Sequence, residues 1–122
     1  KEHALGLWVG VSHIVCDHSI FDGLESNKMM GDLYQNIWSP FTMVDIDGEL
    51  IVSSITHGFY GGKKHEQQCY LGPEPAFYGM DMGIVPYGDG SYLLSALRII
   101  PSLGADPVAD KVFFNMIKWA CK

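Results

Sequence analysis

A chain of 122 residues has the length of a single domain and can bury a substantial hydrophobic core. Its composition, 48% hydrophobic and 18% charged, is typical of a globular protein and excludes a disordered one. The net charge of −6, with only eight Lys and Arg residues, argues against nucleic acid as a partner, because phosphate binding needs a basic surface. No apolar run approaches the roughly 18–20 residues of a membrane span, so we expect no membrane partner.

The first half of the chain predicts strands around one short helix. Residues 4–15 form an apolar run rich in β-branched and aromatic side chains, which predicts a buried strand. A loop dense in Asp, Ser and Gly follows, and the apolar spacing of residues 26–38 then predicts a helix. Residues 41–45 and 50–56 are predicted to form a hairpin, because the Asp-Gly step between them is a turn signal.

The second half predicts a loop, a hairpin and a helix. Residues 57–77 are rich in glycine, proline and charge, which indicates a loop. Residues 77–100 are predicted to form two strands joined by a turn at 87–90, and the second strand, 92–100, is apolar enough to be buried on both faces. Pro101 is expected to end that strand, because proline cannot donate a hydrogen bond to a sheet.

The helix predicted at residues 107–121 has the clearest boundaries in the chain. Asp106 supplies the N-cap carboxylate, and Pro107 fits the first helical position. At about 100° per residue, the apolar side chains form a broad arc, which Phe114 and Cys121 widen further. The remaining polar stripe is narrow: Lys111, Asn115, Lys118 and Lys122. An apolar arc this broad predicts that the helix packs on a sheet and also on a second domain or subunit.

The three cysteines are widely spaced and odd in number, and none forms a CxxC pair. We therefore expect Cys16, Cys69 and Cys121 to be free thiols, mostly buried. Neither neighbour of Cys16 is the glycine of a GxCxG nucleophile elbow, and the other two are no better placed, so no cysteine nucleophile is expected. The chain begins Lys-Glu-His without a methionine, which suggests a fragment of a larger chain, a processed chain or a crystallised domain.

The pair His13 and Asp17 fits the HxxxD pattern of acyltransferases, in which the histidine is a general base and the aspartate orients the structure. The glycine usual after that aspartate is His18 here, and the second signature of those enzymes, DFGWG, is missing. Together with Asp22, these residues also offer metal-ligand atoms. A strand followed by a loop does not gather them on one face, so we expect no metal.

Paired carboxylates of the glycosidase kind stay open as an alternative. The candidate glutamates lie in predicted turns, where solvation also accounts for them: Glu25, Glu49, Glu66 and Glu74. A group of loop aromatics could stack on a sugar, or cover a sheet edge or a partner domain: Phe59, Tyr60, Tyr70, Phe77 and Tyr78.

Two stretches together resemble a known family. CDHSIFDGLESNKMMGDLY, residues 16–34, resembles the DHPIFxGLP segment of class I glutamine amidotransferase-like domains at the C-terminal end of bacterial glycoside hydrolases, mainly family 2 enzymes of the β-galactosidase and β-glucuronidase type. LLSALRIIPSLGADPVADKVFFNMIKWA, residues 93–120, resembles the LSxLRIxxxLGxDPVA ending of the same domains, preceded by matching glycines at Gly88 and Gly90. Ser19 stands where that family has proline, so the turn before Ile20 is expected to differ.

This resemblance implies an α/β fold, a three-layer, flavodoxin-like sheet, of which residues 1–122 would be the C-terminal half. It also implies a non-catalytic accessory domain of a carbohydrate-active enzyme, without cofactor or metal. Such a domain packs on neighbouring domains or subunits through its C-terminal helix, or makes an accessory contact with carbohydrate. Two alternatives stay open. One is a fragment of an HxxxD acyltransferase with His13 as base, and the other is a free-standing module that binds carbohydrate or protein.

Overall fold

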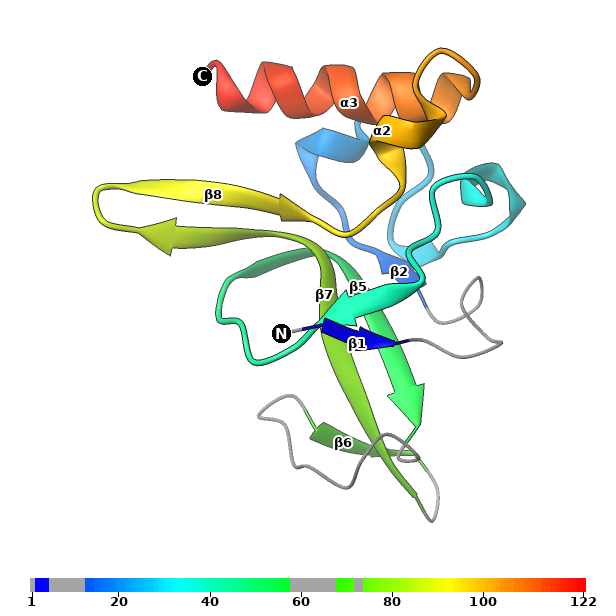
Figure 1. Ribbon diagram of the computed structural model, residues 1–122, viewed down its shortest axis with the longest axis vertical. Coiled ribbons are helices and arrows are strands. Elements are labelled where there is room, and N and C mark those ends of the chain that lie inside the picture. Colours follow the sequence, from blue (N-terminus) through cyan, green and yellow to red (C-terminus); the bar gives the residue numbers. More distant parts are fainter. Residues whose placement is uncertain (1, 5–12, 58–67, 72–73) are drawn as a thin grey trace.

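The computed structural model describes residues 2–4, 13–57, 68–71 and 74–122. Within these ranges the protein combines one eight-stranded sheet with two α-helices, so the α/β class is confirmed. The helices α2 (Ile99–Ser102) and α3 (Pro107–Ala120) lie together at one end of the molecule, and β6 (Gln68–Leu71) lies at the opposite end (Figure 1).

The sheet follows the order β1-β4-β7-β5-β2-β3, and both β6 and β8 also pair with β7. Every strand pair in the described part of the chain is antiparallel. A three-layer, flavodoxin-like arrangement is therefore not confirmed. The remaining strands are β1 (Glu2–Ala4), β2 (His13–Val15), β3 (Lys28–Met29), β4 (Phe41–Met43), β5 (Glu49–His57), β7 (Glu74–Tyr87) and β8 (Gly90–Ser95).

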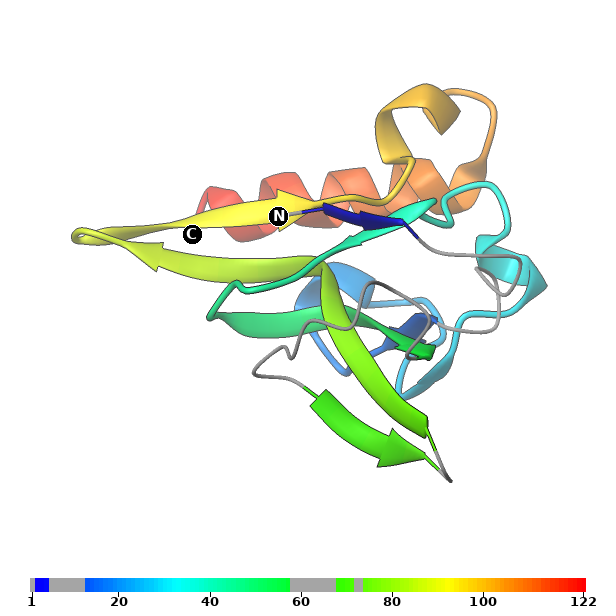
Figure 2. The same ribbon diagram turned by 60° about the horizontal axis from the view of Figure 1, so that its bottom comes forward.

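The long strand β7 connects the two parts of the sheet. Its first part pairs with β5 and β6, and its last part bends away to form a hairpin with β8 (Figure 2). Gly79 lies in this strand where a Cβ atom would collide with the side chain of Thr42 on β4, so the close approach of the two strands requires glycine. The turn between β7 and β8 is confirmed at Gly88 and Asp89, with Gly88 in the left-handed region at φ 58°.

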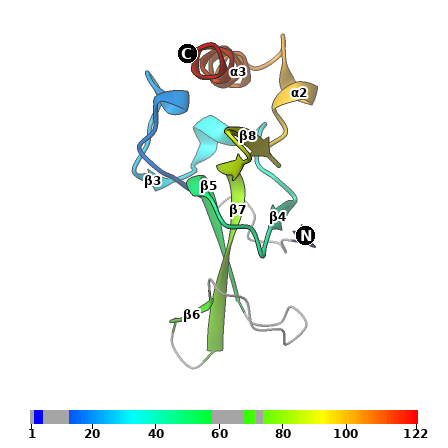
Figure 3. The same ribbon diagram turned by 90° about the vertical axis from the view of Figure 1, so that its left-hand side faces the viewer.

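The hydrophobic core lies between α3 and the sheet, and two short 3₁₀ helices close it. These are η1 (Ser19–Phe21) and η2 (Asp32–Tyr34), and Figure 3 shows α3 above the sheet. Phe21 and Tyr34 meet edge to face with ring centroids 5.8 Å apart, and the Tyr34 hydroxyl donates to the backbone carbonyl of Glu25. Residues 16–34 and 93–120, which lie far apart in the sequence, therefore contribute to a single core.

The helix α3 confirms the prediction for residues 107–121 to within one residue. The Asp106 side chain accepts a hydrogen bond from the Val108 backbone N–H at 3.1 Å, and Pro107 occupies the first turn. The predicted orientation of α3 was wrong at Asn115, which is buried rather than part of the polar stripe. Asn115 Nδ2 donates to the carbonyl oxygens of Ile20 at 2.9 Å and Asp22 at 3.1 Å, so it joins α3 to η1.

The helix predicted at residues 26–38 is wrong, because β3 and η2 occupy this segment. Asn27 has a left-handed backbone, with φ 56°, and Met30 donates its N–H to the His13 carbonyl beside β2. Gly31 then has an extended backbone. Pairing with β2 therefore outweighs the helical preference of this segment, which Gly31 lowers.

The strand predicted at residues 92–100 ends early and is not buried on both faces. β8 stops at Ser95, and four of its six residues are exposed. The Arg98 N–H donates to the Ile37 carbonyl, and the chain then forms α2. Pro101 falls within this short helix rather than after a strand, where its missing N–H costs little.

The hairpin predicted from residues 41–45 and 50–56 is also wrong, although both strands exist. β7 lies between β4 and β5 and pairs with each of them. The strand predicted at 4–15 coincides with β1 and β2 at its two ends, and residues 5–12 lie outside the described residues. The loop predicted at 57–77 contains β6 and the start of β7, while residues 58–67 and 72–73 lie outside the described ones.

Candidate functional site

Three polar side chains come together in the centre of the sheet. His13 belongs to β2, Ser54 to β5 and Asp81 to β7, and these three strands are neighbours. All three residues are 0% exposed. A buried polar group is costly unless it is hydrogen-bonded, and clusters of buried titratable groups are typical of functional sites.

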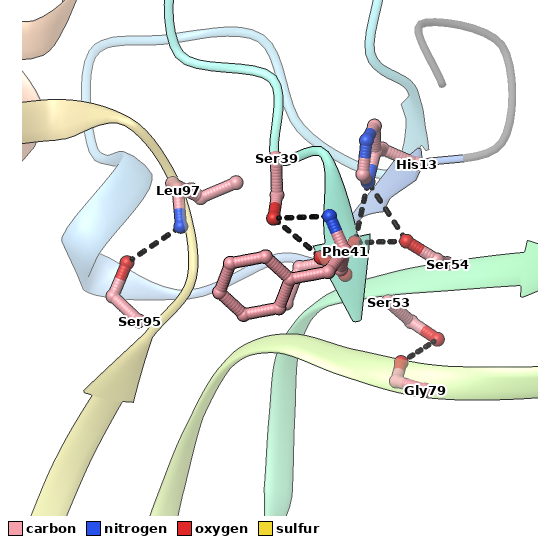
Figure 4. A network of polar contacts seen from close by, with 9 residues as sticks. His13, Ser39, Phe41, Ser53, Ser54, Gly79, Ser95 and Leu97 are labelled. Atoms are coloured by element: carbon pink, nitrogen blue, oxygen red, sulfur yellow. Dashed lines mark hydrogen bonds and ion pairs between the residues drawn. The ribbon is translucent and has the colours of Figure 1, made fainter. Parts of the chain in front are cut away.

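The cluster is tightly hydrogen-bonded on one side of the imidazole ring. His13 Nδ1 lies 2.5 Å from Asp81 Oδ2 and 2.8 Å from Ser54 Oγ, and Figure 4 shows His13 and Ser54 pointing toward one another. Ser54 Oγ also donates to Asp81 Oδ2. His13 Nε2 and Asp81 Oδ1 are buried and have no hydrogen-bond partner.

A β-bulge places the carboxylate. Val52 pairs with Met82 and Ser53 pairs with Met80, so Asp81 is the extra residue of β7. Bulges redirect a side chain out of the regular alternation of a strand. The Asp81 carbonyl accepts a hydrogen bond from the Ala96 N–H at 2.7 Å, which connects the bulge to the end of β8.

The residue types are those of a serine hydrolase triad, but the arrangement is different. In a triad the serine and the carboxylate contact opposite nitrogens of the histidine, so that a proton can pass from the serine to the ring. Here both contact Nδ1, and all three side chains are closed to solvent. In this form the cluster can hold β2, β5 and β7 in register, and it offers no path for a substrate.

The structure does not bring together the side chains of His13 and Asp17, the two residues of the HxxxD pattern. His13 is buried and bonded to Ser54 and Asp81, whereas Asp17 is exposed and makes no hydrogen bond to His13. Base catalysis by His13, which remains a prediction, would require this cluster to open. His18 caps η1 instead: its Nδ1 accepts from the Ile20 N–H at 3.2 Å.

The other candidate site residues are likewise dispersed. Asp22 is exposed, and among the described residues no group of three His, Cys, Asp or Glu side chains could hold a metal ion. Glu25 pairs with Lys28 at 2.8 Å, and Glu49 lies 3.8 Å from His18. The remaining candidates have side chains outside the described residues: Glu66, Glu74 and the aromatics Phe59, Tyr60, Tyr70, Phe77 and Tyr78.

The cysteines differ in exposure. Cys16 and Cys121 are free thiols, and the side chain of Cys69 lies outside the described residues. Cys16 is partly buried, and burial raises the pKa of its thiol. Cys121 is exposed at the end of α3, so the expectation of mostly buried thiols was wrong at this position.

The second candidate site is the outer face of α3, which we define as Phe114, Ile117, Lys118 and Cys121. Phe114 is 57% exposed and Ile117 is 47% exposed, although the same helix buries Val112 completely. Lys118 Nζ lies 5.7 Å from the centroid of the Phe114 ring. Large exposed apolar side chains on one helix face are typical of an interaction surface.

Sequence reasoning found His13 but missed its partners. Asp81 carries a signal, because it is a single carboxylate within the apolar run MDMGIV, and such a residue is either exposed or paired. Ser54 carries none, since serine is common in strands with one solvated face. Among the described residues, no helix has both the length and the apolar character needed to cross a bilayer. Comparisons with protein-family models, with curated proteins and with solved structures gave no match.

Proposed function

We propose that this chain is a non-catalytic structural domain of a carbohydrate-active enzyme, a glycoside hydrolase, and that it packs on another domain or subunit of that enzyme through the outer face of α3. The resemblance of residues 16–34 and 93–120 to amidotransferase-like domains suggests the host enzyme. The observation that carries the packing role is the exposure of Phe114 and Ile117 on a helix that is otherwise firmly anchored.

The anchoring of α3 makes its exposed residues informative. Val108, Ala109 and Val112 enter the core, and Asn115 bonds to the η1 segment. The helix therefore has no freedom to rotate and bury Phe114 against its own sheet. Covering that side chain requires a second body, and burial of a large apolar side chain contributes about 1.5–3 kcal/mol.

The non-catalytic role agrees with the closure of the polar cluster. A hydrolase needs at least one acidic or nucleophilic group that reaches its substrate. His13, Ser54 and Asp81 are sealed from solvent. The finer fold class, a three-layer flavodoxin-like arrangement, belongs to this proposal and would need parallel strands from outside the 122 residues. An accessory contact with carbohydrate also remains part of the proposal.

The test compares this chain alone with the complete polypeptide that contains it. We expect the complete polypeptide to hydrolyse an aryl β-glycoside and the isolated chain to show no hydrolysis. In the complete polypeptide, the double variant Phe114→Asp/Ile117→Asp should lower the temperature of inactivation while leaving kcat unchanged at low temperature. Ile100→Asp is the matched control, because Ile100 is 66% exposed on α2, outside the outer face of α3.

Two results would contradict the proposal. Hydrolysis by the isolated chain would show that it is catalytic. Equal behaviour of the double variant and Ile100→Asp would show that the outer face of α3 packs on nothing within the enzyme.

A further inference from the structure

The outer edge of β8 is open in the described part of the chain. β8 pairs with β7 on one side only, and the hairpin projects from the body of the protein (Figure 1). Tyr87 and Gly90 close the turn as a hydrogen-bonded pair. From there, opposite residues of β7 and β8 alternate between pairs that share backbone hydrogen bonds and pairs that do not. The backbone N–H and C=O groups of every second residue therefore point outward: Ser91, Leu93 and Ser95. Pro86, opposite Ser91, agrees with this assignment because it has no N–H to offer.

This edge lacks the features that normally prevent strand addition. Natural edge strands carry charged residues, prolines or bulges, whereas β8 reads Gly-Ser-Tyr-Leu-Leu-Ser. α3 does not close the edge near Ser91 either. A hollow of about 390 Å³ separates the start of the strand from the end of the helix, and it is lined by Ser91, Trp119, Ala120 and Lys122. An extended strand can therefore reach the outward-facing backbone groups.

We propose that the strand that binds here is β8 of a second copy of this chain, in an antiparallel pair about a two-fold axis through Leu93. With that axis, Leu93 faces its own equivalent and Ser91 faces Ser95 of the second copy. In this register the outward-facing N–H and C=O groups of Ser91, Leu93 and Ser95 in one copy face those of the other copy, which gives about six new hydrogen bonds. The two sheets become one continuous sheet.

Charge and side-chain complementarity favour a second copy over an unrelated strand. Asp89 precedes β8 and Arg98 follows it, both are exposed, and neither forms an ion pair with a described residue. Antiparallel pairing brings the Asp89 end of one copy beside the Arg98 end of the other, at both ends of the interface. On the face away from α3, Tyr92 comes beside Leu94 of the second copy, which covers a side chain that is now 55% exposed.

The first test removes one outward N–H group without touching the hairpin. Ser91→Pro deletes a donor to the second copy and no donor to β7, and Ser91→Ala is the control that keeps the N–H. Light scattering after size exclusion should show a concentration-dependent dimer for the native chain and Ser91→Ala. Ser91→Pro should weaken association roughly 30-fold, because each dimer loses two hydrogen bonds. Circular dichroism checks that each variant folds.

The second test uses the predicted register. Ser91→Lys/Ser95→Lys places like charges opposite each other and should abolish the dimer, whereas Ser91→Lys/Ser95→Glu places opposite charges there and should keep it. Both serines are exposed, and Ser95 Oγ accepts a hydrogen bond from the Leu97 N–H at 3.2 Å, so circular dichroism also checks that both double variants fold. A native chain that is monomeric up to about 1 mM would overturn the proposal. So would a dimer of equal strength in all the variants, because it would use another surface.

Discussion

Asn115 provides the sharpest test of how α3 is held. It is 4% exposed, and its Nδ2 group donates to two backbone carbonyls in and just after η1, Ile20 and Asp22. Asn115→Ala removes both donors and leaves two acceptors in or near the core without a partner. A net hydrogen bond contributes about 1 kcal/mol, and an unsatisfied buried group costs about 1–3 kcal/mol. We therefore expect the free energy of unfolding to fall by about 2–4 kcal/mol, less the few tenths that alanine adds as a better helix former.

The assay is urea unfolding followed by tryptophan fluorescence, because Trp38 and Trp119 both pack against the core. With a slope of about 2 kcal/mol per molar urea, the midpoint should fall by roughly 1–2 M. Lys118→Ala is the matched control on the exposed side of the same helix and should change stability by less than about 0.5 kcal/mol. Asn115→Leu separates the loss of the hydrogen-bond donors from the loss of side-chain volume, because it restores the volume without restoring the donors.

A fall of less than about 0.5 kcal/mol for Asn115→Ala would refute the reasoning. It would mean that the two bonds do not hold α3 on η1 and that apolar packing alone positions the helix. The argument about the outer face of α3 would then weaken too, because a helix free to rotate could bury Phe114 by itself.

Three further predictions concern other parts of the fold. Gly79→Ala should cost about 2–4 kcal/mol of stability by forcing β7 away from β4, while Gly31→Ala, which has open space, should have little effect in the same urea assay. Burial and the nearby Glu25 carboxylate raise the pKa of Tyr34 from about 10 to about 12. The contribution of Tyr34 to stability is therefore present below pH 10 and is lost as pH rises from 10 to 12. Equal stability at pH 9 and pH 11.5 would contradict this. Cys121 should react with iodoacetamide before Cys16, because it is exposed and burial raises the pKa of the Cys16 thiol; peptide mapping that found the reverse order would contradict the placement of α3.

Local signals in the sequence specify two elements of this protein. Asp106 and Pro107 specify the start of α3 through a cap and a fixed backbone angle, and no distant residue is needed for either. The Gly88-Asp89 turn is likewise encoded by residues that tolerate its backbone. The α/β class was implied by the family resemblance of residues 16–34 and 93–120, and the observed strands and helices agree with it.

Strand pairing and the burial of polar residues depend on contacts between distant parts of the folded chain. The Asp-Gly step between β4 and β5 predicted a hairpin of these two strands, but β7 lies between them in the sheet. The amide of Asn115 looked solvated in a helical projection, yet two carbonyls 93 and 95 residues away satisfy it. His13 depends in the same way on Ser54 and on Asp81, which a bulge turns toward it. Such partners are invisible to local patterns, because hydrogen bonds between distant strands exist only once the chain has folded.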